Sequence, residues 1–242
     1  MLIGPQISSA NDAIASNLQS LRTSIAAAAA SVHRSVDSIT LVAVSKGHGA
    51  DRVRAAAACG VRDFGESYLQ EALPKIDALR DLPATWHFIG RIQANKTAAI
   101  AHGFDWVHGV DRLKIAERLS AQRPPHAPPL QLCLQVNIAG EPGKAGIEPQ
   151  SAPQLARQLA ALPRLQLRGL MCILPAGRSA EDNSRGFHAL ALLLQQINAH
   201  GGALDTLSMG MSSDYRQAIQ QGATLVRIGT ALFGPRPGAR LG

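Results

Sequence analysis

The stretch Ile39-Thr40-Leu41-Val42-Ala43-Val44-Ser45-Lys46 indicates the fold of this chain. Most of its residues are apolar or favour strands, and the run is nearly continuous, which is typical of a parallel strand buried on both faces. Such strands deliver their last residues to the ligand-binding end of a sheet or barrel. Lys46 is therefore expected in a partly apolar site, where desolvation lowers its pKa and frees its amine to attack carbonyl groups. Taken alone, a lysine at a strand end is more often a solvated terminus.

Composition narrows the class of protein. The chain has 242 residues, of which 46% are hydrophobic and 4% aromatic, so the core must be built from Leu, Ile, Val and Ala. The formal net charge is +7, but the basic residues are scattered, with no block of five or six and no aromatic residues between them. This pattern argues against nucleic-acid binding and favours a small anionic ligand.

Cysteine usage and the N-terminus indicate a compartment. Cys59, Cys133 and Cys172 are unevenly spaced and form no CxxC motif, which argues against a disulfide framework or a zinc site and fits a reducing cytoplasm. Residues 1–11 lack the features of a signal peptide. The alanine-rich segment 25–31 is too short to cross a membrane. We expect a soluble cytoplasmic protein without a membrane span or a metal.

Beyond the first strand, strand and helix patterns alternate along the chain. A helix is expected over 8–34, capped by Ser8 or Ser9. Eight strands are expected over 39–46, 61–66, 86–90, 106–110, 130–138, 165–174, 206–211 and 225–233. Helices are expected between them over 50–59, 67–80, 94–101, 112–121, 151–161, 181–199 and 213–220.

Eight alternating units in a chain of this length predict a closed (β/α)8 TIM barrel. An open doubly wound sheet is the alternative, which the lack of a GxGxxG motif after the first strand disfavours. We expect one domain over 1–242, with an outer helix over 1–36, the barrel over 37–234 and a tail over 235–242. The proline-rich segment 123–129 is interpreted as a loop within the barrel.

In such a barrel the loops after the seventh and eighth strands often hold a phosphate. Glycine-exposed backbone N–H groups and hydroxyls supply the donors, here from Ser208, Gly210, Ser212, Gly229 and Thr230. A carbonyl-seeking lysine beside a phosphate site indicates a phosphorylated aldehyde such as pyridoxal 5′-phosphate, although aldolases combine the same two features.

Motifs spread over the chain support the prediction of a pyridoxal 5′-phosphate site. They are Leu41-Val42-Ala43-Val44-Ser45-Lys46, Phe64-Gly65-Glu66-Ser67-Tyr68-Leu69-Gln70-Glu71, Trp86-His87-Phe88-Ile89-Gly90, Gln135-Val136-Asn137-Ile138, Leu207-Ser208-Met209-Gly210-Met211-Ser212 and Val226-Arg227-Ile228-Gly229-Thr230. In these segments the sequence closely resembles the YggS/PROSC family of pyridoxal phosphate homeostasis proteins, which is itself similar to the N-terminal barrel domain of alanine racemase. The resemblance runs from about residue 41 to residue 234.

The resemblance implies roles for individual residues. Lys46 corresponds to the lysine that binds the cofactor as a Schiff base, and Arg227 to the residue facing the pyridine nitrogen. Ser208, together with the backbone at Gly229 and Thr230, corresponds to the phosphate ligands. A permanently charged arginine disfavours protonation of the pyridine nitrogen and weakens the ring as an electron sink.

Two positions depart from the family pattern. Ser67, which the resemblance implies as a further cofactor contact, stands where the family usually has Asn; its hydroxyl keeps one hydrogen-bonding group and loses the second one of the amide. Leu174 stands where the family has Pro, which affects only the local turn.

Other polar residues receive structural interpretations. His87 lies within an apolar strand and is interpreted as a core or supporting histidine. Glu66 and Glu71 flank a strand-to-helix turn, and capping or surface roles are expected for them. Lys144 lies in a glycine-bearing loop, where attraction of phosphate and simple solvation are both open.

The resemblance implies a role in pyridoxal phosphate homeostasis, sequestering the cofactor and supplying it transiently to apoenzymes, as a monomer or weak dimer and without catalytic residues. The alternative is a pyridoxal phosphate-dependent racemase or related enzyme. Racemisation needs a second acid or base on the opposite face of the substrate, and neither Tyr68 nor Tyr215 is obviously placed for this. No segment after Phe233 is long enough for the β-domain of alanine racemase.

Overall fold

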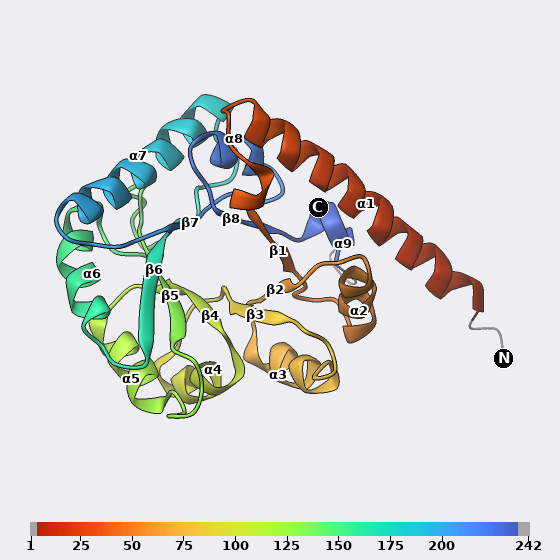
Figure 1. Ribbon diagram of the computed structural model, residues 1–242, viewed down its shortest axis with the longest axis horizontal. Helices are drawn as coiled ribbons and strands as arrows, with labels where there is room; N and C mark the ends of the chain where they lie inside the picture. Colours follow the sequence, from red (N-terminus) through yellow and green to blue (C-terminus); the bar gives the residue numbers. More distant parts are fainter. Residues whose placement is uncertain (1–3, 237–242) are drawn as a thin grey trace.

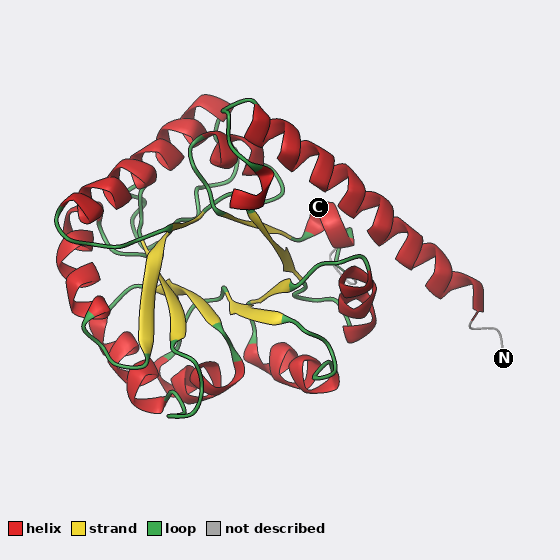
Figure 2. Ribbon diagram, in the orientation of Figure 1, coloured by secondary structure: helices red, strands yellow, loops and turns green. Residues whose placement is uncertain are grey.

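The structure is a computed structural model that describes residues 4–236, with side chains from residue 12 onward. Eight parallel strands pair in chain order, and β8 pairs with β1 to close the barrel. Figures 1 and 2 show the strands around the centre and the helices outside them. The strands are β1 (Thr40–Val44), β2 (Asp63–Glu66), β3 (Thr85–Phe88), β4 (Trp106–Val110), β5 (Leu130–Gln135), β6 (Leu165–Met171), β7 (Thr206–Ser208) and β8 (Leu225–Ile228).

The helices follow the strands in turn, after one that precedes the barrel. They are α1 (Gly4–Ala30), α2 (Ala50–Ala58), α3 (Leu69–Ala78), α4 (Thr97–Gly103), α5 (Leu113–Gln122), α6 (Ala152–Ala160), α7 (Ala180–Ala199), α8 (Tyr215–Gln220) and α9 (Thr230–Phe233). Short 3-10 turns are η1 (Val36–Ser38), η2 (Ala94–Lys96) and η3 (Pro149–Ser151). The predicted (β/α)8 barrel is thus confirmed, and the doubly wound alternative is wrong.

Several predicted boundaries are wrong. The fifth, sixth and seventh strands end at Gln135, Met171 and Ser208 instead of residues 138, 174 and 211, and the eighth ends at Ile228 instead of 233. After Ile228 the chain turns at Gly229 into the short helix α9, so the apolar residues Leu232 and Phe233 are buried from a helix. The first helix begins at Gly4, so the expected caps at 8 and 9 lie inside it.

The first helix covers one side of the barrel. Its residues Ile14, Leu18, Leu21 and Ile25 recur at helical spacing and are buried. Along the edge of the molecule α1 lies against α2, α8 and α9 (Figure 1). The expected tail over 235–242 lies outside the described residues from position 237 onward. Within the described part of the chain, no helix is both long and apolar enough to cross a bilayer.

Side chains alternate between the barrel interior and the helix layer. On β3, Trp86 packs outward on Phe64 of β2, with ring centroids 5.6 Å apart. The next residue, His87, points inward, and its Nδ1 lies 2.9 Å from His108 Nε2 on β4. This period of two directs the last inward residues of each strand toward the mouth, the end where the C-termini of the strands meet.

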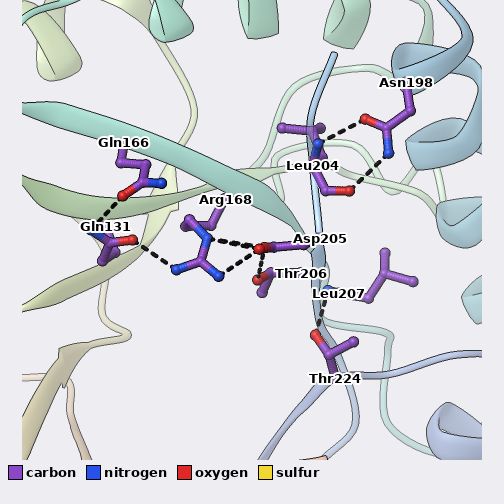
Figure 3. A network of polar contacts seen from close by, with 9 residues as sticks. All are labelled: Gln131, Gln166, Arg168, Asn198, Leu204, Asp205, Thr206, Leu207 and Thr224. Carbon is purple, nitrogen blue, oxygen red and sulfur yellow. Dashed lines mark hydrogen bonds and ion pairs between the residues drawn. The ribbon is translucent and has the colours of Figure 1, made fainter. Parts of the chain in front are cut away.

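The opposite end, here called the base, is closed by polar pairs between side chains of β5 and β6 and residues at or just before the starts of β7 and β8 (Figure 3). Arg168 donates from Nη2 to Asp205 Oδ2 at 2.5 Å and from Nη1 to Gln131 Oε1 at 2.9 Å. Gln131 Nε2 in turn donates to Gln166 Oε1 at 3.1 Å. The charged and amide groups of the base hydrogen-bond one another, so their role is to stabilise the fold.

Candidate functional site

Lys46 lies two residues beyond the end of β1, at the mouth of the barrel. The turn after it is fixed from α3, because the backbone N–H of Gly47 donates to Glu71 Oε2 at 2.9 Å. Gly47 has a φ of 75°, and an added Cβ would lie 3.0 Å from Arg236 Cδ. Backbone geometry, a carboxylate and a neighbouring arginine therefore constrain the position of the lysine.

The surroundings of Lys46 favour its neutral form. The side chain is half-buried, and burial lowers the pKa of its amine below the ordinary value. The charges of Arg236 and Arg227 act in the same direction, and the carboxylates of Glu66 and Glu71 only partly oppose them. A larger neutral fraction makes this amine a better nucleophile toward carbonyl groups.

Behind the lysine, Glu66 and Lys75 form a buried ion pair between the barrel and α3. Glu66 is 0% exposed, and its Oε1 accepts from Lys75 Nζ at 2.5 Å and from Ser45 Oγ at 2.6 Å. Its Oε2 has no hydrogen-bond partner among the described residues. Burial raises the pKa of Glu66, although hydrogen bonds from Lys75 and Ser45 oppose the rise. The surface or capping role predicted for Glu66 is therefore wrong.

Arg227 reaches the mouth from the end of β8. Its Nη1 donates to Ser208 Oγ at 2.6 Å and its Nη2 to the carbonyl oxygen of Cys172 at 2.9 Å. The residue is 4% exposed, and burial lowers the pKa of its guanidinium. A guanidinium carries five N–H donors and stays protonated in proteins. Among the described residues only two of these donors have acceptors, so the others are available to a ligand.

A group of backbone donors lies beside β1, where β8 passes into α9. The N–H groups of Gly229 and Thr230 have no acceptor among the described residues, and that of Ala231 meets only Ser212 Oγ at 3.4 Å. An added Cβ at Gly229 would lie 3.2 Å from the carbonyl oxygen of Val44. Unused N–H groups around a glycine, with two hydroxyls nearby, form a cradle suited to an anion.

The predicted site residues separate into two sets. Lys46, Arg227, Gly229 and Thr230 come from the neighbouring strands β1 and β8 and gather at the mouth, and Ser67 follows β2 on the other side of β1. Ser208 lies beneath them, is 0% exposed, and has its hydroxyl between Arg227 Nη1 and His108 Nδ1.

Other candidates lie away from the mouth or at its rim. His87 is buried and bonded to Asp63 and His108, as a core histidine would be. Lys144 is exposed in the loop after β5. Tyr68 is 52% exposed, and the Tyr215 hydroxyl donates to Ser24 on α1, outside the barrel.

The sequence contained signals for two residues that the predicted site omits. Lys75 occupies the buried face of α3 with Leu69, Ala72 and Leu79, a helical spacing that places a charge among apolar residues. Such a charge needs a buried partner, and Glu66, nine residues earlier at the end of β2, is that partner. Ser212 was among the possible phosphate donors, but only the structure shows it beside the unused N–H groups.

Comparisons with known proteins agree with this geometry. The family model for the N-terminal domain of alanine racemase matches residues 11–237. The alanine racemase of Corynebacterium glutamicum has a TM-score of 0.68 at 20% identity and covers 96% of this chain and 64% of its own, which supports the fold alone. The chain is thus a barrel of the alanine racemase N-terminal class.

More similar relatives narrow the class. The pyridoxal phosphate homeostasis protein of Pseudomonas aeruginosa is 53% identical over 223 residues, which cover 92% of this chain and 96% of the relative. That of Escherichia coli is 46% identical over 229 residues, covering 92% and 97%. PipY of Synechococcus elongatus, solved with pyridoxal phosphate bound, has a TM-score of 0.81 at 39% identity and covers 91% of this chain and all of its own. This chain belongs to the family of pyridoxal phosphate homeostasis proteins.

Proposed function

We propose that this protein binds pyridoxal 5′-phosphate at the barrel mouth and acts in cytoplasmic cofactor homeostasis, with residues 37–234 as one binding domain. The desolvated amine of Lys46, next to a cradle of unused backbone N–H groups, carries this proposal. Bound there, the cofactor supplies an aldehyde that condenses with the neutral lysine amine to a Schiff base and releases water. The names of the relatives and the cofactor in PipY support the same ligand.

The residues present fit the three polar parts of this ligand. Lys46 meets the aldehyde, and the unused N–H groups of Gly229 and Thr230 meet the phosphate. Arg227 is proposed to face the ring nitrogen with its free N–H donors. Because a guanidinium donates and does not give up its proton, it keeps that nitrogen unprotonated and limits carbanion chemistry.

Two predicted contacts need separate treatment. Ser208 stays a prediction as a phosphate ligand, but its burial and its two side-chain partners favour a supporting role. We propose Ser212 as the hydroxyl that meets the phosphate, because it lies beside the N–H of Ala231. Ser67 remains a proposed ring contact at the rim.

The site favours holding and releasing the cofactor over turnover. A racemase needs an acid or base on each face of the substrate carbon, and neither tyrosine of this chain lies where it would supply the second one. We therefore propose a carrier, a monomer or weak dimer, that limits free cofactor and passes it transiently to apoenzymes. The relatives are named as homeostasis proteins.

Absorbance spectroscopy tests the proposal. Wild type and Lys46→Ala are mixed with pyridoxal 5′-phosphate, and each amino acid is then added in deuterated water. We expect a lysine-dependent band near the visible edge and no exchange of the α-proton. Cofactor-dependent exchange that Lys46→Ala abolishes would support a racemase-like enzyme instead. No band in the wild type would overturn the binding proposal.

A further inference from the structure

A continuous chain of side-chain hydrogen bonds crosses the barrel interior beneath the mouth. Arg227 Nη1 donates to Ser208 Oγ at 2.6 Å, and this oxygen lies 2.7 Å from His108 Nδ1. His108 Nε2 lies 2.9 Å from His87 Nδ1. His87 Nε2 lies 3.0 Å from Oδ1 of Asp63, the first residue of β2. The chain therefore connects a cation at the mouth to a carboxylate at the base.

Such an interior is unusual for this architecture. Barrel interiors of this type are dominated by Val, Ile and Leu, yet His87, His108 and Ser208 are each 0% exposed. The bond between His108 on β4 and Ser208 on β7 joins strands that are not neighbours, so it spans the interior. Buried polar groups are costly unless each finds a partner. These residues are therefore expected to depend on one another.

Only one assignment of protons along this chain of hydrogen bonds gives every donor an acceptor. An ionised carboxylate only accepts, so His87 carries its proton on Nε2, toward Asp63. Burial lowers the pKa of His108 well below its ordinary value, and the charge of Arg227 acts in the same direction, so His108 is neutral with a single N–H. That N–H, on Nε2, meets the bare Nδ1 of His87. Nδ1 of His108 then accepts from the Ser208 hydroxyl, whose oxygen accepts from Arg227.

This arrangement restrains the guanidinium of Arg227. Ser208 engages one terminal nitrogen and the carbonyl oxygen of Cys172 engages the other. With both anchored, the planar group cannot rotate, and the direction of its unused N–H donors is set. When the Ser208 hydroxyl donates its own proton to His108, its oxygen lone pairs remain available to accept from Arg227.

We propose that His108 and His87 are positioning residues that act through Ser208 to orient Arg227 toward the ring nitrogen of the bound cofactor. This inference rests on the proposed function for the identity of the ligand. The chain of hydrogen bonds itself belongs to the protein without ligand, so it is tested separately.

The first test uses the ligand-free wild type. Long-range ¹H–¹⁵N NMR correlations of the imidazoles, assigned with His87→Gln and His108→Gln, report which ring nitrogen carries the proton. We expect His108 to be neutral, and each histidine to carry a proton on Nε2. An Nδ1-protonated or doubly protonated His108 would reverse the direction of the chain and overturn the proposal.

The second test uses the loaded protein. Ser208→Ala and His108→Leu should each raise the Kd for pyridoxal 5′-phosphate roughly tenfold, the scale of one hydrogen bond to a charged group, and shift the absorbance band of the bound cofactor. Ser208→Thr, which keeps the hydroxyl, should restore both values. Cys133→Ala is the matched control, because Cys133 on β5 is equally buried but makes no hydrogen bond in the chain.

The outcomes separate the two proposals. If the wild type fails to bind the cofactor, the proposed function is wrong. The NMR result still tests the proton positions in the chain of hydrogen bonds. Normal binding and an unshifted band in Ser208→Ala and His108→Leu leave the function standing and overturn the positioning roles. If these variants do not fold, the NMR result on the wild type decides the inference.

Discussion

The two ends of the barrel use arginine in opposite ways. At the base, Arg168 is paired with Asp205 and Gln131 (Figure 3). Its guanidinium also lies over the ring of Trp106, 5.2 Å from the centroid. At the mouth, Arg227 is more deeply buried, yet only two of its donors have acceptors among the described residues. The base uses its polar groups to close the fold, and the mouth keeps some of them unused. This difference marks the end of the barrel that has a ligand to bind.

Lysine shows the same contrast within the mouth. Lys75 donates to Glu66 and to the carbonyl oxygen of Ser45, and it is 7% exposed. Lys46 has no ion pair among the described residues, and burial lowers its pKa. Lys75 therefore supports the structure, and Lys46 is the lysine proposed to react with the cofactor.

The largest expected effect on stability is at the supporting lysine. Lys75→Met leaves the Glu66 carboxylate buried with only Ser45 as partner, so unfolding free energy should fall by about 3–5 kcal/mol. Urea denaturation measures this change. Arg80→Met, which removes the exposed pair with Asp77, is the control and should cost less than about 1 kcal/mol. Equal losses in the two variants would contradict the structural role of Lys75.

A smaller loss is expected at the turn that leads to the phosphate cradle. Gly210 has a φ of 93°, and an added Cβ would lie 2.6 Å from the Cβ of Ala218. Gly210→Ala should therefore cost about 1–3 kcal/mol of stability and weaken cofactor binding. Gly177→Ala is the control, because its φ is also positive, at 80°, but no atom lies within 4 Å of the added Cβ. Thermal unfolding and cofactor titration of both variants measure the difference, and an equal loss would show that the clash is unimportant.

The interior between the two ends should make stability depend on pH. His108 is 0% exposed, and burial lowers its pKa well below the ordinary value. Below about pH 6.5 the unfolded imidazole binds a proton that the folded one does not, so stability falls as pH falls. His108 should contribute a slope of about 1.4 kcal/mol per pH unit, down to its folded pKa. Urea titrations between pH 7 and 5 should show a shallower slope in His108→Leu, and equal slopes would contradict the buried neutral state.

The smallest effect is expected at the base. Burial raises the pKa of Asp205, but hydrogen bonds from Arg168 and Thr206 outweigh it, so the pKa lies below its ordinary value. Because the pair is partly exposed, Arg168→Met should lower stability by at most about 1 kcal/mol. Cofactor affinity should not change. A large loss of affinity would mean that the base also serves the ligand and would remove the contrast between the two ends.

Much of the fold followed from local pattern. The continuous apolar strands, the helices between them and the glycines that end these elements predicted a closed barrel, because eight such units have few other packings. The predicted end of the eighth strand was wrong, because buried apolar residues such as Leu232 and Phe233 fit a strand as well as the helix α9 in which they lie. Whether the chain continues as a strand or turns into a helix at Gly229 depends on the tertiary structure around that residue.

The site was predictable to the extent that barrel topology brings strand ends together. Lys46 and Arg227 both end strands, so their meeting at the mouth followed from the fold. The pairing of Glu66 with Lys75 was not predicted, because a lysine on a helix is expected to be solvated unless the buried face of that helix is known. The hydrogen bond between His108 and Ser208 joins residues 100 positions apart, and no local pattern indicates such a pairing.

The most direct test of the central claim is chemical mapping of the lysine that binds the cofactor. The protein is mixed with pyridoxal 5′-phosphate, reduced with borohydride and digested, and the peptides are analysed by mass spectrometry. The account predicts the reduced cofactor on Lys46 at stoichiometric yield, and no comparable labelling in Lys46→Ala. Labelling spread over the other lysines, or undiminished in Lys46→Ala, would contradict it and leave Lys46 as an ordinary charge at the end of a strand.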